Sequence, residues 1–274
     1  MVVTKLYGIL GHPLGHTLSP AMQNAAFRAA GIDALYVALP VEPARIRRAL
    51  AGLKVSGFSG FNVTVPYKET VLPYLDRISP DARAVGAVNT IVADPRTGRW
   101  VGHNTDVYGF QRLAARAGIR TAGRRILLIG AGGAARAVCA AIGGAAASID
   151  IVNRTPARAR KLRAAMPKKI QKKIDVLSST PMSHAYDLII NATSVGLLRG
   201  DRLPAPAWIF EKATAAIDLI YNPPRTDFLR RARRAGCRIA GGLDMLLYQG
   251  ARAFELWTRR PAPVAAMRRA LLRK

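Results

Sequence analysis

A chain of 274 residues, half of them hydrophobic, is long enough to bury a sizeable core and to form two domains. Its 42 basic residues outnumber 16 acidic ones and give a formal net charge of +26. No apolar run reaches the ~18 residues that a membrane span requires, and the chain leads into Gly11-His12-Pro13 without a site like those of signal-peptide cleavage. We therefore expect a globular, soluble, cytoplasmic protein and exclude a membrane-spanning one.

The positive charge has two interpretations. It could attract anions, either nucleic acid or a carboxylate substrate with a phosphate-rich cofactor, or it could belong to solvated, arginine-rich helix faces. Aromatic residues are not interleaved with the basic ones, as single-strand binding would require. The excess is dispersed over residues 45–48, 158–173, 225–238 and 252–274. This dispersal favours solvated faces, and we expect no nucleic-acid partner.

The two cysteines predict no disulfide. Cys139 falls in a helical pattern and Cys237 at the start of a strand, and both have apolar neighbours. Such positions are typical of buried free thiols.

The first third of the chain alternates strands and helices. Strands are predicted at Leu6–Leu10, Leu35–Val41 and Gly60–Val65, with a helix opening at Ser19-Pro20 and another at Pro43–Leu53. This β-α-β-α-β order indicates a parallel sheet. A hairpin is predicted next, from Val88–Ala93 and Arg99–Gly102, so the sheet should be mixed.

Hydroxyl groups gather where the first predicted helix begins. Ser19 is a good N-cap, followed by Pro20 at the first helical position. Thr17 and Ser19, beside the unpaired backbone N–H groups of a helix start, suit a carboxylate. His12 and His16 are four residues apart, but the intervening Pro13 and Gly15 argue against a helix that would align them, so we expect no metal site.

Two motifs predict acid/base chemistry. In NVTVPYKE, residues 62–69, Pro66 ends a strand and a helical pattern starts with Lys68. Ligands of open α/β sheets bind outside the carboxyl ends of the strands, so Asn62, Thr64 and Lys68 are candidates for one site. In GHNTD, Asp106 stands where a strand gives way to a helix, and with Lys68 it could form an acid/base pair. The alternative is a surface lysine and a helix N-cap.

A dinucleotide-binding domain is predicted after the helix that runs from Asp106 to Gly118. Arg125–Ile129 is an apolar strand that ends in Gly130. Gly130, Gly132 and the small Ala135 fit the fingerprint in which glycines permit the turn and the close approach of a pyrophosphate.

The tip of the next strand, Ile149–Val152, predicts the cofactor. An NAD enzyme usually carries Asp or Glu there, but this chain has Asn153-Arg154-Thr155, with Arg158 following in a helical pattern. Two guanidinium groups and a hydroxyl can surround the 2′-phosphate of NADP. The alternative is that Arg154 and Arg158 are ordinary surface arginines.

The rest of the chain predicts more strands and helices. Strands are expected at Tyr186–Ile190, Ala216–Ile220 and Arg238–Ala240, and a helix with an arginine-rich face at Thr226–Ala235. Lys168–Lys173 is interpreted as a solvated loop. From Gly242 the pattern is helical, with Met245 and Gln249 one turn apart.

The chain resembles the shikimate dehydrogenases and their quinate-using relatives over nearly its whole length. The motifs occur in the family's order: NVTVPYKE, AVNT (87–90), GHNTD (102–106), GAGGAA (130–135), NRT (153–155), NATSVG (191–196) and GGLDMLLYQG (241–250). GAGGAA is a common signal, but NVTVPYKE together with NTD and MLLYQG is specific. Position 17 is Thr where Ser is usual, and Gln23 stands where His is common.

The resemblance implies a two-domain α/β fold with a cleft between the domains. A mixed, mostly parallel substrate domain would span residues 1–106, a Rossmann-like NADP domain 107–241, and C-terminal helices that return to the substrate domain 242–274. The implied reaction is the reversible, NADPH-dependent reduction of 3-dehydroshikimate to shikimate, in aromatic amino acid biosynthesis. The implied partner is this small acid alone, and the protein would be a monomer or a homodimer.

The resemblance also assigns roles to individual residues. Lys68 and Asp106 would be catalytic, Lys68 supplying the proton and Asp106 orienting a substrate hydroxyl. The substrate would contact Thr17, Ser19, Asn62, Thr64, Asn89, Tyr221 and Gln249. NADP would contact Gly130, Ala131, Gly132, Gly133, Ala134, Asn153, Arg154, Thr155, Arg158, Thr193, Ser194, Leu219, Gly242 and Met245.

Three alternatives remain at this point. A quinate/shikimate dehydrogenase of dual specificity would differ in its substrate contacts rather than in these motifs. Methylenetetrahydrofolate dehydrogenases share a similar two-domain plan, but NTD and MLLYQG argue against them. A basic nucleic-acid-binding protein could have kept the fold, although the intact motifs at Lys68, Asp106 and Gly130 count against this.

Overall fold

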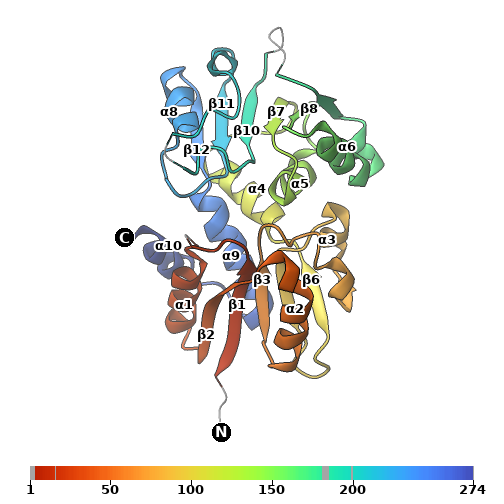
Figure 1. Ribbon diagram of the computed structural model, residues 1–274. Coiled ribbons are helices and arrows are strands. Elements are labelled where there is room, and N and C mark those ends of the chain that lie inside the picture. Colours follow the sequence, from red (N-terminus) through yellow and green to blue (C-terminus); the bar gives the residue numbers. More distant parts are fainter. Residues whose placement is uncertain (1–3, 16, 181–184, 199, 274) are drawn as a thin grey trace. The chain divides into compact units, whose positions relative to one another are not determined.

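The computed structural model describes residues 4–15, 17–180, 185–198 and 200–273 (Figure 1). The chain divides into two compact units. Unit 1 comprises Met1–Thr105 and Leu247–Lys274, and unit 2 comprises Asp106–Leu246. Within the described ranges, no helix combines the length and the apolar character that crossing a membrane demands.

Unit 1 is built on a mixed sheet. Its helices and strands are β1 (Lys5–Gly11), α1 (Ser19–Ala29), β2 (Ala34–Pro40), the 3-10 turn η1 (Pro43–Arg45), α2 (Ile46–Val55), β3 (Gly60–Val63), the 3-10 turn η2 (Leu72–Tyr74), β4 (Arg77–Ile78), α3 (Pro80–Val85), β5 (Thr90–Ala93), β6 (Trp100–His103), the C-terminal part of α9 (Leu243–Thr258) and α10 (Val264–Leu272). The strand order is β2-β1-β3-β5-β6-β4. Strands β2, β1 and β3 run parallel, while β5 pairs antiparallel with both β3 and β6. The predicted mixed sheet and hairpin are confirmed.

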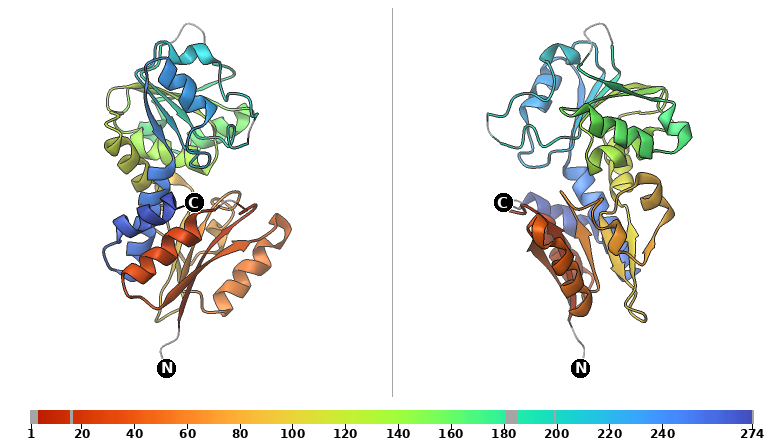
Figure 2. Two further views of the ribbon diagram at one scale, coloured as in Figure 1. Left: turned by 90° about the vertical axis from the view of Figure 1, so that its left-hand side faces the viewer. Right: turned by 45° about the vertical axis from the view of Figure 1, so that its right-hand side comes forward.

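Helices cover both faces of the sheet of unit 1. On one face Tyr7 of β1 stacks on Phe27 of α1 and contacts Trp257 of α9. Figure 2 shows α1 and α10 side by side at this face. On the other face, residues of α2 such as Leu50 pack against Phe61 of β3. The layers follow from the sequence, because successive strand residues point to opposite faces.

The structure corrects three predictions in unit 1 and adds two short elements. Ser19 is the first residue of α1 and Leu18 its N-cap, so the predicted start is one residue late. Strand β3 ends at Val63 rather than Val65, and the segment around Lys68 forms turns instead of a helix. Pro73 falls in the following 3-10 turn and has no N–H to continue a helix. The short elements β4 and α3 were not predicted.

Unit 2 is a doubly wound α/β unit. Its helices and strands are α4 (Asp106–Arg116), β7 (Arg125–Ile129), α5 (Gly133–Ile142), β8 (Ser148–Val152), α6 (Pro156–Ala165), α7 (Lys168–Gln171), β9 (Ile174–Leu177), β10 (Leu188–Asn191), the 3-10 turn η3 (Ala207–Phe210), β11 (Ala215–Asp218), α8 (Asp227–Arg234), β12 (Arg238–Gly241) and the start of α9. The strands are parallel in the order β12-β11-β10-β7-β8-β9. The order reverses between β7 and β10, and dinucleotides bind at such a reversal.

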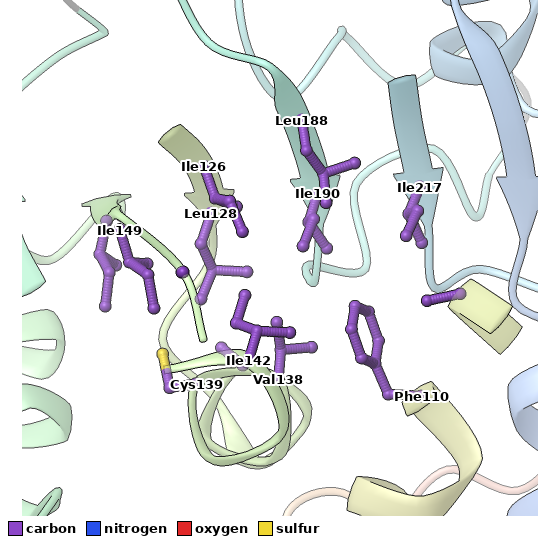
Figure 3. Packing of buried hydrophobic residues seen from close by; sticks show 14 of the residues in the cluster. Phe110, Ile126, Leu128, Val138, Cys139, Ile142, Ile149, Leu188, Ile190 and Ile217 are labelled. Carbon is purple, nitrogen blue, oxygen red and sulfur yellow. The ribbon is translucent and has the colours of Figure 1, made fainter. Parts of the chain in front are cut away.

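Buried side chains hold the helices of unit 2 on its sheet. Ile126 and Leu128 of β7, with Ile190 of β10, lie on the face that α5 covers. In Figure 3 they point toward Val138 and Ile142. The opposite face carries a second cluster in which Phe210 of η3 packs edge to face on Phe228 of α8. Apolar packing thus holds helices against both faces of the sheet.

In unit 2 one sequence expectation changes and one strand is added. Residues 168–171 form the short helix α7 instead of a loop, because Ile170 packs against Gly143. Strand β9 was not predicted. The expected buried free thiols are confirmed, since Cys139 and Cys237 are both free and buried.

Candidate active site

The loop before α1 places the hydroxyl of Thr17 against the backbone of Ser19, the first residue of the helix. The backbone N–H of Ser19 donates to Oγ1 of Thr17 at 3.3 Å. Ser19 is 3% exposed and Thr17 is partly buried. His16 lies outside the described residues. Among those that are described, no three His, Cys, Asp or Glu side chains come together as a metal site.

Asn62 lies in a buried network at the carboxyl end of β3. Its Oδ1 accepts a 2.7 Å hydrogen bond from Oη of Tyr36. Its Nδ2 donates to the backbone oxygen of Asn89 at 3.1 Å and to Oγ1 of Thr90 at 3.0 Å. The amide of Asn62 is therefore engaged with protein groups, which positions Asn89 and the start of β5.

A second polar group joins Asn89, Thr105 and Gln249. Oδ1 of Asn89 accepts from the backbone N–H of Thr105 at 2.7 Å, and Nδ2 of Asn89 donates to Oγ1 of Thr105 at 3.0 Å. Nδ2 of Asn89 also donates to Oε1 of Gln249 at 3.4 Å. Gln249 is thus held by Asn89, 160 residues away in sequence. We name Asn89, Thr105 and Gln249 the amide cluster.

The loop that carries Lys68 adjoins the amide cluster. The backbone N–H of Val88 donates to the backbone oxygen of Lys68 at 2.8 Å. Because Val88 directly precedes Asn89, this bond holds the loop of Lys68 beside Asn89. Thr64 packs on Gly11, where an added Cβ would come within 2.4 Å of its Cγ2. Lys68 and Thr64 are both partly buried. Asp106, 4% exposed, begins α4 directly after Thr105.

In unit 2 the turn between β7 and α5 has the geometry of an anion site. Gly130 has φ of 112°, a region that favours glycine, and an added Cβ would lie 3.0 Å from the backbone oxygen of Ala192. Gly132 is the N-cap of α5, and an added Cβ there would meet no described atom within 4 Å. Backbone N–H groups at the start of α5 can therefore approach a phosphate. Ala131, Gly133 and Ala134 belong to the same turn and first helical positions.

The tip of β8 presents its polar residues to solvent. Arg154, Thr155 and Arg158 are exposed, and Nδ2 of Asn153 donates to the backbone oxygen of Thr155 at 2.8 Å. Thr155 is the N-cap of α6, yet within the described chain its side chain accepts no capping hydrogen bond. The hydroxyl of Thr155 and the guanidinium groups of Arg154 and Arg158 thus come from five consecutive residues, 154–158.

The loops after β10 and β11 carry the remaining predicted contacts. Thr193 Oγ1 donates to Oδ1 of Asn191 at 2.7 Å, and Ser194 beside it is exposed. Gly242 approaches Leu219 so closely that a Cβ would lie 2.1 Å from the Leu219 backbone oxygen. Met245 follows one turn into α9 and is buried. Tyr221 is partly buried, and burial raises the pKa of its hydroxyl.

Family models match three segments of the chain. They describe a shikimate dehydrogenase substrate-binding domain at residues 9–91, shikimate/quinate 5-dehydrogenase at 112–199, and the shikimate 5'-dehydrogenase C-terminal domain at 242–272. The chain is also 48% identical to shikimate dehydrogenase (NADP+) of Moorella thermoacetica, covering 98% of this chain and 92% of that protein. The chain belongs to the shikimate dehydrogenase family.

Solved structures of this family superpose on nearly the whole chain. Shikimate 5-dehydrogenase of Thermus thermophilus, in complex with NADP(H) and shikimate, has a TM-score of 0.86 and 37% identity, covering 97% of this chain and 98% of that one. 5-ketofructose reductase of a Gluconobacter species has a TM-score of 0.82 and 35% identity, with 98% of both chains covered. A protein named for a different substrate thus shares the fold of the shikimate dehydrogenase family.

The sequence interpretation missed Tyr36, Asn191 and Asp218, none of which it named as a site residue. All three are fully or almost fully buried and make hydrogen bonds to residues of the predicted site or its loops. Asn191 and Asp218 end the apolar strands β10 and β11. A polar residue at the carboxyl end of an apolar strand was the available signal.

Proposed function

We propose that this protein is an NADP-dependent shikimate dehydrogenase that reduces 3-dehydroshikimate to shikimate and catalyses the reverse reaction. The observation that carries the proposal is the amide cluster: Asn89, Thr105 and Gln249 come from three segments and meet beside the loop of Lys68. Amide and hydroxyl groups of this kind suit a substrate that carries several hydroxyls. Shikimate dehydrogenase (NADP+) of Moorella thermoacetica is the corresponding relative.

Unit 1 supplies the groups that would hold the acid. Thr17 and Ser19, at the start of α1, would bind its carboxylate, because hydroxyls and helix N-terminal N–H groups favour an anion. Thr64, Asn89 and Gln249 would bind its ring hydroxyls. Asn62 would orient Asn89 through its own hydrogen bonds. Tyr221 is the remaining proposed substrate contact.

The residues of unit 2 fit a dinucleotide with a 2′-phosphate. The turn at Gly130 and Gly132 leaves room for a pyrophosphate at the start of α5. Arg154, Thr155 and Arg158 would hold the 2′-phosphate, and the tip of β8 carries no carboxylate to repel it. When bound, the nicotinamide would supply or accept the hydride. Thr193, Ser194, Leu219, Gly242 and Met245 would line its half of the site.

Lys68 and Asp106 would perform the acid/base step. The Nζ ammonium of Lys68 would polarise the substrate carbonyl and give its proton to the oxygen as the carbon is reduced. In the reverse direction the amine takes a proton from the hydroxyl. Asp106, buried at the start of α4, would accept a hydrogen bond from a neighbouring substrate hydroxyl and so orient the ring.

The proposal includes the biological setting implied by the family: the cytoplasm, and aromatic amino acid biosynthesis. The substrate is a free small acid, and neither a membrane nor a nucleic acid takes part. The protein would act as a monomer or a homodimer. A dual quinate/shikimate specificity is the alternative, because one of the matching family models is named for both acids.

NADP reduction measured with shikimate and with quinate, side by side, tests the proposal. NADPH oxidation with 5-ketofructose should be run in the same series, because a relative of similar fold is named for that substrate. The proposal predicts a higher kcat/KM with shikimate than with quinate and no turnover of 5-ketofructose. Preference for either other substrate, or preference for NAD over NADP, would contradict it.

A further inference from the structure

A buried carboxylate lies under the loops that would hold the nicotinamide half of NADP. Asp218 ends β11, is 0% exposed, and pairs in register with Asn191, the last residue of β10. Its Oδ1 accepts from Nδ2 of Asn191 at 3.0 Å and from the backbone N–H of Ile220 at 3.1 Å. Its Oδ2 accepts a 2.6 Å hydrogen bond from Oγ1 of Thr226. Three donors therefore converge on one buried carboxyl group.

Asn191 extends this connection into the loop after β10. Its Oδ1 accepts from the backbone N–H of Thr193 at 3.1 Å and from Oγ1 of Thr193 at 2.7 Å. Its Nδ2 also donates to the backbone oxygen of Val195 at 3.1 Å. The side chain of Asn191 thus fixes the turn that carries Thr193 and Ser194, and Asp218 fixes Asn191.

The segments that Asp218 and Asn191 hold also contact the neighbouring loops. The backbone N–H of Gly242 donates to the backbone oxygen of Ile220 at 3.1 Å, so the segment that Asp218 holds also positions the start of α9. On the other side, the loop after β10 packs on Gly130, where an added Cβ would lie 3.0 Å from the backbone oxygen of Ala192. The loops after β7, β10, β11 and β12 are therefore joined through the hydrogen bonds and contacts around Asp218 and Asn191.

The topology says what these loops would touch. A dinucleotide that places its pyrophosphate at the turn after β7 and its adenosine at β8 extends its other half over β10 and β11. We propose that Asp218 is a positioning residue which, through Asn191, Ile220 and Thr226, holds the loops after β10 and β11 in the shape that binds the nicotinamide half of NADP. This inference rests on the proposed function.

Titration of the purified protein with NADPH, followed by fluorescence, tests the inference because it yields both Kd and the number of sites. Asp218→Ala removes the common acceptor and should raise Kd at least ~10-fold, as misplaced binding groups do. Asp218→Asn keeps Oδ1 as an acceptor and can donate from Nδ2 to Thr226, so its Kd should stay within ~3-fold of wild type. Asn191→Ala should weaken NADPH binding as Asp218→Ala does. If Asp218→Ala does not fold, the Kd of Asn191→Ala tests the inference instead.

Tyr186→Phe is the matched control. Oη of Tyr186 donates a buried 2.7 Å hydrogen bond to Oδ2 of Asp150 in the same unit. Tyr186 precedes the first residue of β10, whereas Asn191 is the last residue of that strand. The variant should lose stability and keep the wild-type Kd for NADPH. A purely structural role for Asp218 would lower the number of sites in Asp218→Ala and leave Kd unchanged.

Each outcome decides the inference. A wild-type Kd in Asp218→Ala or in Asn191→Ala overturns it, and so does an equal loss of affinity in Tyr186→Phe. If the wild-type protein binds NADPH and oxidises shikimate, such results leave the proposed function intact. If the wild-type protein does not bind NADPH, both the function and the inference fail.

Discussion

Oη of Tyr36 donates a 2.7 Å hydrogen bond to Oδ1 of Asn62, and both side chains are buried. Tyr36 lies in the middle of β2, outside every motif of the site. Asn62 passes the connection on, because its Nδ2 donates to the backbone oxygen of Asn89. Asn89 in turn holds Thr105 and Gln249. A tyrosine at the edge of the sheet is thereby joined to the proposed substrate contacts.

Tyr36→Phe should impair both stability and substrate binding. The change leaves Oδ1 of buried Asn62 without its donor, which costs about 1–3 kcal/mol in the free energy of unfolding. A displaced Asn89 should raise KM for shikimate by about tenfold and leave KM for NADP unchanged. Urea unfolding and steady-state kinetics measure these effects.

Tyr7→Phe is the control for Tyr36→Phe. Tyr7 is the register partner of Tyr36 in the adjacent strand, is 2% exposed, and hydrogen-bonds Ser59 instead of the site. The Tyr7→Phe variant should have a lower free energy of unfolding and an unchanged KM for shikimate. Equal kinetic effects in the two variants would contradict the connection through Asn62.

Lys68→Ala tests the acid/base step. Without the ammonium group, the turnover number should fall by at least ~10²-fold, the usual contribution of a general acid, while shikimate binding is largely retained. Rapid-mixing kinetics and a binding titration with shikimate measure the two quantities. Lys54→Ala is a matched control, because Lys54 pairs with Asp76 at 2.9 Å on the surface of the same unit. Near-normal turnover in Lys68→Ala would refute the assignment.

Periodicity and turn residues predicted most of the sheet elements. The strand Arg125–Ile129 was predicted with its observed ends, because the apolar run Ile126–Ile129 directly follows Arg125 and is ended by Gly130. The prediction of a helix around Lys68 was wrong. The helical pattern there is local, whereas the observed turns depend on proline and on the hydrogen bond from the backbone N–H of Val88 to the backbone oxygen of Lys68. Strands as short as β4 carry too few residues to show a period.

The candidate site was predictable where a residue contributes a reactive group in a motif. It was not predictable where a residue acts through another, as Tyr36 acts through Asn62. Such roles arise from contacts between residues far apart in sequence, like that of Asp218 with Asn191. Sequence also could not indicate that the amide of Asn62 is engaged by Tyr36 and Thr90, since this depends on strand register.

Arg154→Ala should reveal how the cofactor is selected. Arg154 lies exposed at the tip of β8, where the guanidinium would bind the 2′-phosphate. Hydrogen bonds to charged groups contribute about 1.5–3 kcal/mol, so affinity for NADP should fall roughly ten- to a hundredfold. NAD lacks this phosphate, and its affinity should hardly change. Arg160→Ala, an exposed arginine on the same α6, should affect neither cofactor, and equal losses of both in Arg154→Ala would exclude the role.

The net charge of +26 predicts a dependence on salt if it steers anions. Salt screens exposed charges over about 10 Å at 0.1 M, so kcat/KM should fall as ionic strength rises, with kcat little changed. Initial rates at low substrate, measured across a series of potassium chloride concentrations, test this. A flat profile would indicate that the arginines only solvate the surface.

Asp218→Asn should change how stability depends on pH. Burial raises the pKa of Asp218 from 3.8 to about 6, against the opposing effect of its hydrogen bonds from Thr226, Ile220 and Asn191. Between these two values the unfolded carboxyl has lost its proton while the folded one retains it. Rising pH therefore favours the unfolded state over this window, and the effect is complete once the folded carboxyl also ionises.

The asparagine variant has no proton to lose at this position. The free energy of unfolding of wild type, relative to that of Asp218→Asn, should therefore fall by about 3 kcal/mol between about pH 4 and about pH 7, since one pKa unit corresponds to about 1.4 kcal/mol. Urea unfolding of both proteins at several pH values measures the difference. The sign distinguishes the alternatives: a carboxylate stabilised mainly by its three donors would have a lowered pKa, and the difference would then rise with pH.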